Sequence, residues 1–131
     1  MTGLDTNVLV RYVMQDDPGQ SPRASRLIES LSADDPGFVP VVVLVELVWV
    51  LSGSYGLDRA QVATVLGTLL RSKELVVDSA DLVTQALRRY STAGADFADA
   101  LIERLATAAG CSATMTFDAG AVKAAAMTRV P

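Results

Sequence analysis

The sequence predicts an α/β fold in which a short central parallel sheet of about four to five strands is flanked by helices. Short strand-like runs alternate with longer segments whose apolar residues recur at helical spacing. Acidic residues stand directly after two of those runs, at Asp5 and Asp118. Ligands of open parallel sheets bind outside the carboxyl ends of the strands. With 131 residues, half of them hydrophobic, the chain fits one domain, residues 1–131.

The first half of the chain supplies two strands and three helices. Residues 1–5 predict a very short strand, and Thr6 and Asn7 suit the start of the helix that follows it. A second helix is expected over 21–31, and a strand at 38–39 leads into residues 40–51. In that last segment, eleven of the twelve residues are apolar or proline. Since Pro40 suits a first helical position and Gly53 a stop, we expect a buried helix that carries Glu46 to the edge of the core.

The second half continues the alternation of helices and strands. Asp58 and Gln61 resemble a capping box for a helix that extends to about residue 70. A strand is expected at 75–77, then helices over 79–90 and 96–109, with Ser79 and Asp96 at their starts. Residues 112–117 predict a strand that ends at Asp118, and residues 119–127 predict a last helix. Whether residues 128–131 form one more strand is left open.

The composition restricts the chemistry. The absence of histidine excludes imidazole bases, histidine-based triads and histidine-rich zinc sites. Oxygen ligands remain, and they suit Mg²⁺ or Mn²⁺. A single cysteine, Cys111, cannot form an internal disulfide, and no signal peptide or membrane span is evident, so we expect a cytoplasmic protein. The net charge of −4 argues against a nucleic acid held by charge alone.

Each acid also has a purely structural interpretation. Asp5 and Asp118, taken singly, are as well explained by a helix cap or a turn. Asp96 suits an N-cap and lies far from the apolar stripe of its helix. Asp99 lies at the margin of that stripe, which favours a role in a site. We expect Glu103, one turn later, to be a solvated surface acid, although a place in the site stays open for both Glu103 and Asp96.

Taken together, the acids indicate a cation site more strongly than any one of them does. Four carboxylates within about 4–6 Å of one another form six pairs, and each pair repels by roughly 3–4 kcal/mol at an effective dielectric constant of 20. A marginally stable domain cannot hold such a cluster ionised without bound cations. One or two divalent ions would remove the repulsion, and a pair of such ions can activate a water for phosphodiester hydrolysis.

Four motifs together carry a resemblance that spans nearly the whole chain. They are Gly3-Leu-Asp-Thr-Asn-Val-Leu-Val-Arg-Tyr, Glu46 in its apolar segment, Phe97-Ala-Asp-Ala-Leu-Ile and Thr116-Phe-Asp. In this order and spacing they resemble a PIN domain and, more narrowly, the VapC toxins of bacterial toxin–antitoxin pairs.

The resemblance implies a Mg²⁺- or Mn²⁺-dependent ribonuclease that is inhibited by a small cognate antitoxin and is usually a dimer. Its metal-binding acids map onto Asp5, Glu46, Asp99 and Asp118. Thr6, Asn7 and Thr116 match its supporting polar positions, and Asp96 lies near the third acid. Arg11 could contact RNA or be a surface arginine without a role, and Arg88 and Arg89 are weaker candidates.

Two further expectations complete the interpretation. The hydrophobic content exceeds what so small a core can bury, which predicts a homodimer with the helices at 21–31 and 41–51 as candidate surfaces. The alternative function is a non-catalytic metal- or partner-binding α/β domain that retains the acids. A phosphatase with an Asp-x-Asp motif is disfavoured because Asn7 stands where the second acid is needed.

Overall fold

The computed structural model describes residues 1–131, which divide into two compact units, Met1–Ala80 and Asp81–Pro131. Unit 1 holds a three-stranded parallel sheet of β1 (Thr2–Gly3), β2 (Gly37–Val39) and β3 (Leu75–Val77). Its strand order is β1-β2-β3, so β2 is central. The helices of unit 1 are α1 (Thr6–Met14), α2 (Gln20–Glu29), α3 (Val41–Trp49) and α4 (Arg59–Arg71), and α3 continues into a π-helical turn at Val50–Ser54.

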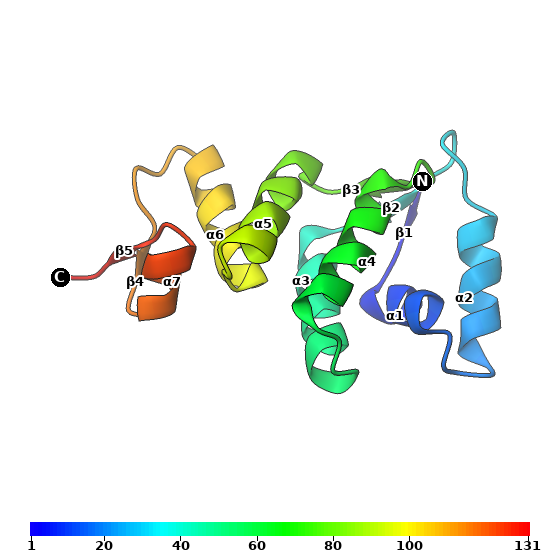
Figure 1. Cartoon of the computed structure of the whole chain (residues 1–131). Coiled ribbons are helices and arrows are strands. Elements are labelled where there is room, and N and C mark those ends of the chain that lie inside the picture. The colour runs from blue at the N-terminus through cyan, green and yellow to red at the C-terminus, as the bar shows by residue number, and fades with distance from the viewer. The chain divides into compact units, whose positions relative to one another are not determined.

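The chain enters α1 directly from β1, as Figure 1 shows. The amide of Leu4 still donates to the carbonyl of Phe38 at 2.9 Å, so the sheet pairing reaches the residue before Asp5. Gly37 lies between the side chains of Leu4 and Leu31, and a Cβ at that position would come within 2.8 Å of both. A larger residue at this position would therefore require the ends of the Leu4 and Leu31 side chains to move.

The core of unit 1 consists of aliphatic side chains from the sheet and the four helices. Each fully buried residue of this kind contributes about 1.5–3 kcal/mol relative to exposure. The largest of them are Leu9, Val39, Leu44, Leu47, Leu51, Val62 and Leu66. Residues 40–51 were expected to form a buried helix, but α3 buries only the face that carries Val43, Leu44 and Leu47. Val42 and Trp49 on α3 are 64% and 81% exposed.

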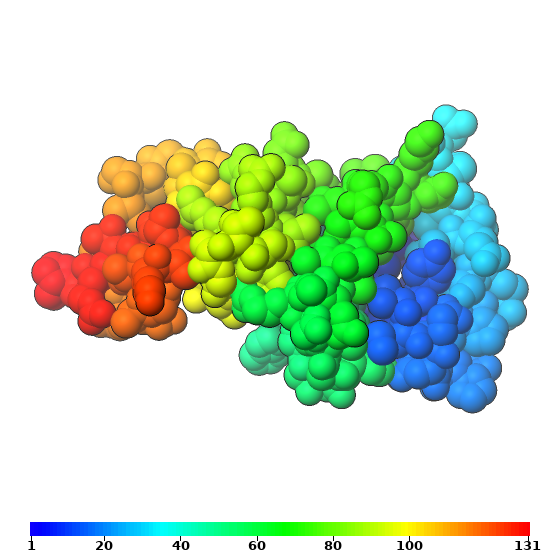
Figure 2. Space-filling view, in the orientation of Figure 1, coloured from blue at the N-terminus to red at the C-terminus, as the bar shows by residue number.

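Unit 2 contains most of α5 (Ala80–Thr92), then α6 (Phe97–Ala108), α7 (Ala119–Ala124) and a two-stranded parallel sheet of β4 (Met115–Thr116) and β5 (Thr128–Arg129). The space-filling view shows α7 and β5, in red, against the orange segment that carries β4 (Figure 2). Tyr90 and Phe97 meet edge to face in the core, with ring centroids 6.3 Å apart. This geometry is one of the two preferred arrangements of aromatic pairs.

The predicted α/β class is confirmed, and all five strands pair in parallel. They form a sheet of three and a sheet of two. The strand left open at the C-terminus is present, since Thr128 and Arg129 pair with Met115 and Thr116. None of the helices combines the length and apolar character that crossing a membrane requires.

Candidate metal centre

Asp5 stands where β1 ends and α1 begins. Its backbone is extended, and its Oδ1 accepts a hydrogen bond from the amide of Thr6 at 2.7 Å, so it is the N-cap of α1. An acid at this position also interacts favourably with the positive end of the helix dipole. The capping interpretation of Asp5 is therefore correct, but capping uses only one of its oxygens, and the side chain remains exposed.

Glu46 is joined to the same helix end by Thr6. The hydroxyl of the buried Thr6 donates to Oε1 of Glu46 at 2.8 Å, across 40 positions in the sequence. Asp5 and Glu46 thus line one open cavity of about 640 Å³, here called the acid cavity. It is lined by Asp5, Thr6, Asn7, Val10, Arg11, Glu46, Val50, Ser54 and Tyr55. Two acids predicted from distant parts of the sequence are brought together in unit 1.

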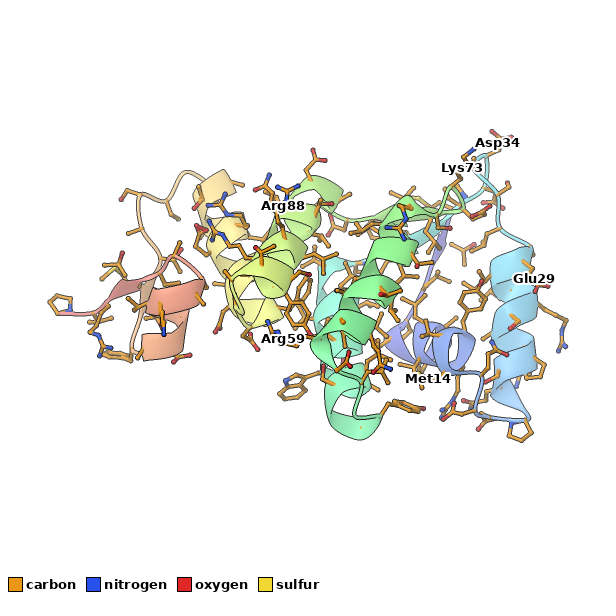
Figure 3. The ribbon with its side chains drawn as sticks, in the orientation of Figure 1. Met14, Glu29, Asp34, Arg59, Lys73 and Arg88 are labelled. Atoms are coloured by element: carbon orange, nitrogen blue, oxygen red, sulfur yellow. The ribbon has the colours of Figure 1, made fainter.

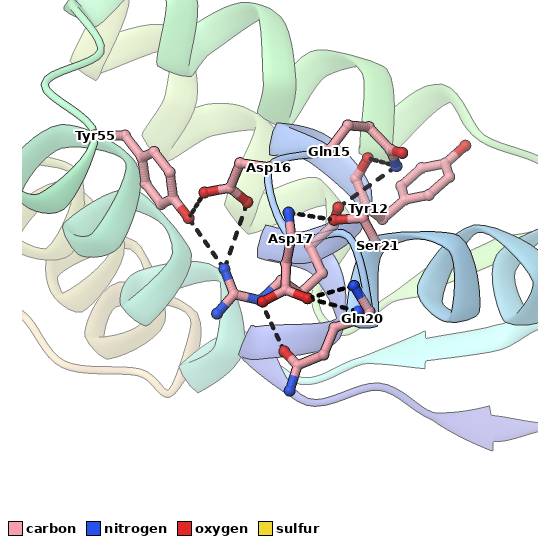
Figure 4. Close-up of polar contacts among 9 residues, drawn as sticks. Tyr12, Gln15, Asp16, Asp17, Gln20, Ser21 and Tyr55 are labelled. Carbon is pink, nitrogen blue, oxygen red and sulfur yellow. Dashed lines mark hydrogen bonds and ion pairs between the residues drawn. The ribbon is translucent and has the colours of Figure 1, made fainter.

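Arg11 at the edge of the acid cavity belongs to a polar network that Figure 4 shows in close-up. Its Nη1 donates to the Tyr55 hydroxyl at 3.3 Å and to Oδ1 of Asp16 at 3.4 Å. Its Nε donates to Oε1 of Gln20 at 2.8 Å, and the Tyr55 hydroxyl donates to Oδ2 of Asp16 at 2.7 Å. Arg11 is therefore held in one orientation by three side chains of unit 1.

Unit 2 brings Asp96, Asp99 and Asp118 near one another. Asp96 caps α6, and its Oδ1 accepts from the amide of Asp99 at 2.9 Å, as predicted. Asp99 is half-buried, and its pKa is raised, first by loss of hydration and then by the negative charges of Asp96 and Asp118. The surrounding protein therefore penalises the ionised form of Asp99.

Asp118 mirrors Asp5 at the end of another strand. It caps α7 and accepts from the amide of Gly120 at 2.9 Å. Thr116, at the end of β4, accepts from the amide of Asp118 at 3.0 Å through its hydroxyl oxygen. The predicted supporting position of Thr116 thus holds the backbone that presents Asp118.

Glu103 contradicts the expectation of a solvated surface acid. It is only 5% exposed and is paired with two arginines. Arg104 donates from Nε to Oε2 at 2.9 Å and from Nη2 to Oε1, and Arg89 donates from Nη1 to Oε2 at 3.2 Å. The pKa of Glu103 is lowered, chiefly by the hydrogen bonds from Arg104, against the opposing effect of burial. Two cations already occupy this carboxylate, so it is unsuited to hold a metal.

The four predicted metal ligands differ from Glu103 in this respect, because none of them forms an ion pair. Carboxylate oxygens supported by threonine hydroxyls and backbone amides form a donor set that suits a hard divalent cation. Neither unit alone gathers three such side chains in a group that could hold a metal ion. The convergence of Asp5, Glu46, Asp99 and Asp118 stays a prediction.

Tyr55 and Ser54 line the acid cavity and were not predicted from the sequence. Tyr55 follows the run Ser52-Gly53-Ser54, and an aromatic residue in such a turn was an available signal. The pairing of Arg89 and Arg104 with Glu103 was not predicted either, because it is visible only in three dimensions. Arg88 lies on the exposed side of α5 and makes no ion pair (Figure 3).

Comparison with known proteins supplies the family. No curated protein matches the chain significantly. The family model described as PIN domain matches residues 4–127, which covers nearly the entire sequence and both units. Domains of this family are generally nucleases and usually use divalent metal ions. The match includes all four predicted metal-binding acids, and the chain belongs to the PIN domain family.

Proposed function

We propose that this protein is a metal-dependent endoribonuclease whose metal-binding acids are Asp5, Glu46, Asp99 and Asp118. The observation that carries the proposal is that one acid is paired with arginines and the four candidate acids are not. Glu103 is neutralised internally by Arg89 and Arg104, whereas the four candidate acids have no basic partner. Asp99 is half-buried beside two other acids, and its raised pKa reports the resulting penalty. A bound cation would relieve that penalty.

The residues around the acids have supporting roles. Thr6 holds Glu46 through its hydroxyl, and the same residue's amide holds Asp5. Thr116 fixes the turn that presents Asp118. Such outer partners fix the orientation of ligands and raise metal affinity. Asn7 lines the acid cavity and is proposed to contribute a polar contact to substrate or water there.

Magnesium or manganese is the proposed ion. When bound, such an ion makes water more acidic and stabilises negative charge that develops on phosphate oxygens. The chain supplies the carboxylates and does not pair them with its own arginine side chains. This division would also account for a nuclease of net charge −4, because a bound ion would supply the positive charge for the scissile phosphate.

Within the family, we propose the role of a VapC-type toxin of a type II toxin–antitoxin pair, cytoplasmic and homodimeric, with a small VapB-like antitoxin as partner. The support for this narrower role is the combined pattern of the four motifs around Asp5, Glu46, Asp99 and Asp118. The exposed Val42 and Trp49 on α3 support a protein contact at one of the two surfaces predicted from sequence.

The test is incubation of purified protein with a structured RNA in Mg²⁺, Mn²⁺ or EDTA. We expect cleavage only with metal, loss of cleavage in Asp99→Asn, and near-normal cleavage in Asp96→Asn. Asparagine is a good N-cap and can still accept from the amide of residue 99, so Asp96→Asn is a matched control in the same turn of α6.

The outcomes separate the two candidate functions. Metal-dependent cleavage that disappears only in Asp99→Asn supports the nuclease. Metal binding without cleavage would favour the non-catalytic module instead. Equal loss of activity in Asp99→Asn and Asp96→Asn would show that the site is drawn wrongly.

A further inference from the structure

A second cavity of unit 1 lies between α1 and α2 and has the opposite electrostatic character to the acid cavity. Its volume is about 340 Å³, and its polar lining is Asn7, Arg11, Gln20 and Arg23. We call it the arginine cavity. Two guanidinium groups and no carboxylate line it, although the chain as a whole is acidic. A cavity of this kind is suited to an anion.

The donors of the arginine cavity are available and partly fixed. Arg11 uses Nε and Nη1 for its bonds to Gln20, Asp16 and Tyr55, which leaves Nη2 without a partner in the protein. Gln20 accepts from Arg11 through Oε1, so its amide nitrogen remains a donor. Asp16 compensates part of the charge of Arg11, whereas Arg23 is exposed and forms no ion pair. Arg23 therefore contributes the uncompensated charge.

The two cavities adjoin each other, because Asn7 and Arg11 line both. An RNA strand with one phosphate at the acid cavity carries further phosphates along the same backbone. Arginine presents planar paired donors that match phosphate oxygens. An extended strand can thus meet the metal-binding acids and the arginine cavity together.

We propose that the arginine cavity binds a backbone phosphate of the RNA substrate next to the cleaved one, with Arg23 and Arg11 as the donors. This inference rests on the proposed ribonuclease function. It makes Arg23 a substrate-positioning residue, and it predicts that the enzyme requires RNA that extends beyond the cleaved bond.

The experiment measures binding of a fluorescent single-stranded RNA oligonucleotide by anisotropy. Binding is measured between about 0.1 and 1 M KCl, so that the dependence of the affinity on salt can be determined. The parent is full-length Asp99→Asn with Mg²⁺, and the RNA is checked on a gel for integrity. Arg23→Gln is compared with Arg26→Gln, an exposed arginine on the same helix that does not line the cavity. A polyglutamate peptide serves as a second anionic probe.

Loss of one phosphate contact reduces the slope of log K against log[salt] by about 0.7 for single strands. Arg23→Gln should therefore bind RNA about fivefold more weakly at the low-salt end and equally well at the high-salt end. Arg26→Gln should keep the slope of the parent. Thermal shift by Mn²⁺, measured in the wild-type background, should be unchanged in Arg23→Gln, because this residue does not line the acid cavity.

Equal slopes for Arg23→Gln and Arg26→Gln would overturn the inference. So would a loss of polyglutamate binding in Arg23→Gln without a loss of RNA binding, since the cavity would then serve an acidic protein partner. The cleavage assay with wild type decides the nuclease proposal separately. If wild type does not cleave RNA and Arg23→Gln still lowers the salt slope, the anion site stands and the nuclease proposal fails.

Discussion

Replacing Glu103 by glutamine tests whether a buried acid of α6 is structural or belongs to the metal centre. The substitution keeps the shape of the side chain and removes its charge. In the native protein the Glu103 side chain is 7% exposed and is paired with Arg89 and Arg104. These bonds join α5 to α6, and Arg89 also donates to the carbonyl of Ala125 at 3.2 Å. We expect Glu103→Gln to destabilise unit 2.

The magnitude follows from the geometry. Unit charges at the 3.2 Å separation of Arg89 and Glu103 attract by about 5 kcal/mol at an effective dielectric constant of 20. The cost of burying Glu103 offsets part of this attraction. The side chains of Arg89 and Arg104 are 28% and 23% exposed, so water replaces part of what they lose. Hydrogen bonds to charged groups contribute about 1.5–3 kcal/mol each, and we expect a net loss of about 2–3 kcal/mol, or roughly 8–12 °C in Tm.

The pH dependence of the effect has a defined sign. The pKa of Glu103 is lowered in the folded protein, so the unfolded chain takes up this proton first as the pH falls. The stabilisation is complete above the usual glutamate value of 4.5 and is lost as the pH falls through the lowered native pKa. The difference in Tm between wild type and Glu103→Gln should therefore be full at neutral pH and should narrow in acid.

Thermal unfolding followed by circular dichroism, from neutral pH to about pH 3, is the assay. Glu29→Gln, on an exposed position of α2 (Figure 3), is the control and should lie within about 0.5 kcal/mol of wild type. Below its Tm, Glu103→Gln should also keep metal-dependent RNA cleavage, unlike Asp99→Asn. A difference in Tm that does not change with pH, or a Tm equal to that of Glu29→Gln, refutes the reasoning.

The remaining predictions concern the metal centre and assembly. Asp5→Asn and Asp99→Asn should each melt above wild type in EDTA and gain less than wild type on addition of Mg²⁺, because each removes one member of a repelling group. Melting of both variants below wild type in EDTA would rule out converging acids. The protein should also be a homodimer. The mass measured by light scattering at micromolar concentration should therefore exceed the 13.8 kDa of the monomer. A measured mass equal to that of the monomer would contradict the prediction.

Local signals in the sequence predicted most of the helices and strands. The capping box of Asp58 and Gln61 is present, with both reciprocal bonds. The strand at 75–77 has the predicted bounds. The helical wheel separated Asp96, which caps α6, from Asp99, which is half-buried. These features depend on residues within one or two helical turns of one another, and for that reason the sequence alone was sufficient.

Features that depend on distant partners were not predictable in the same way. Glu103 was expected at the surface because charged residues of an amphipathic helix usually are, but Arg89, 14 positions earlier, lies beside it in the fold. The division of the strands into a sheet of three and a sheet of two also escaped prediction. Strands of two or three residues carry too little alternation of polar and apolar side chains to specify their neighbours.

The acids of this chain differ in whether their hydrogen-bond donors are neutral or positively charged, and this difference connects the sequence to the proposed function. Asp5, Glu46 and Asp118 accept hydrogen bonds from an amide or a hydroxyl, namely Thr6 N, Thr6 Oγ1 and Gly120 N. Neutral donors of this kind satisfy lone pairs and fix the orientation of a carboxylate, but they leave its net charge in place. Exposed acids tolerate that condition because water screens them. Asp99 is half-buried beside Asp96 and Asp118 and does not have that screening. This chain places Arg89 and Arg104 on Glu103 instead, so in the proposed function a divalent cation from solution would stabilise ionised Asp99.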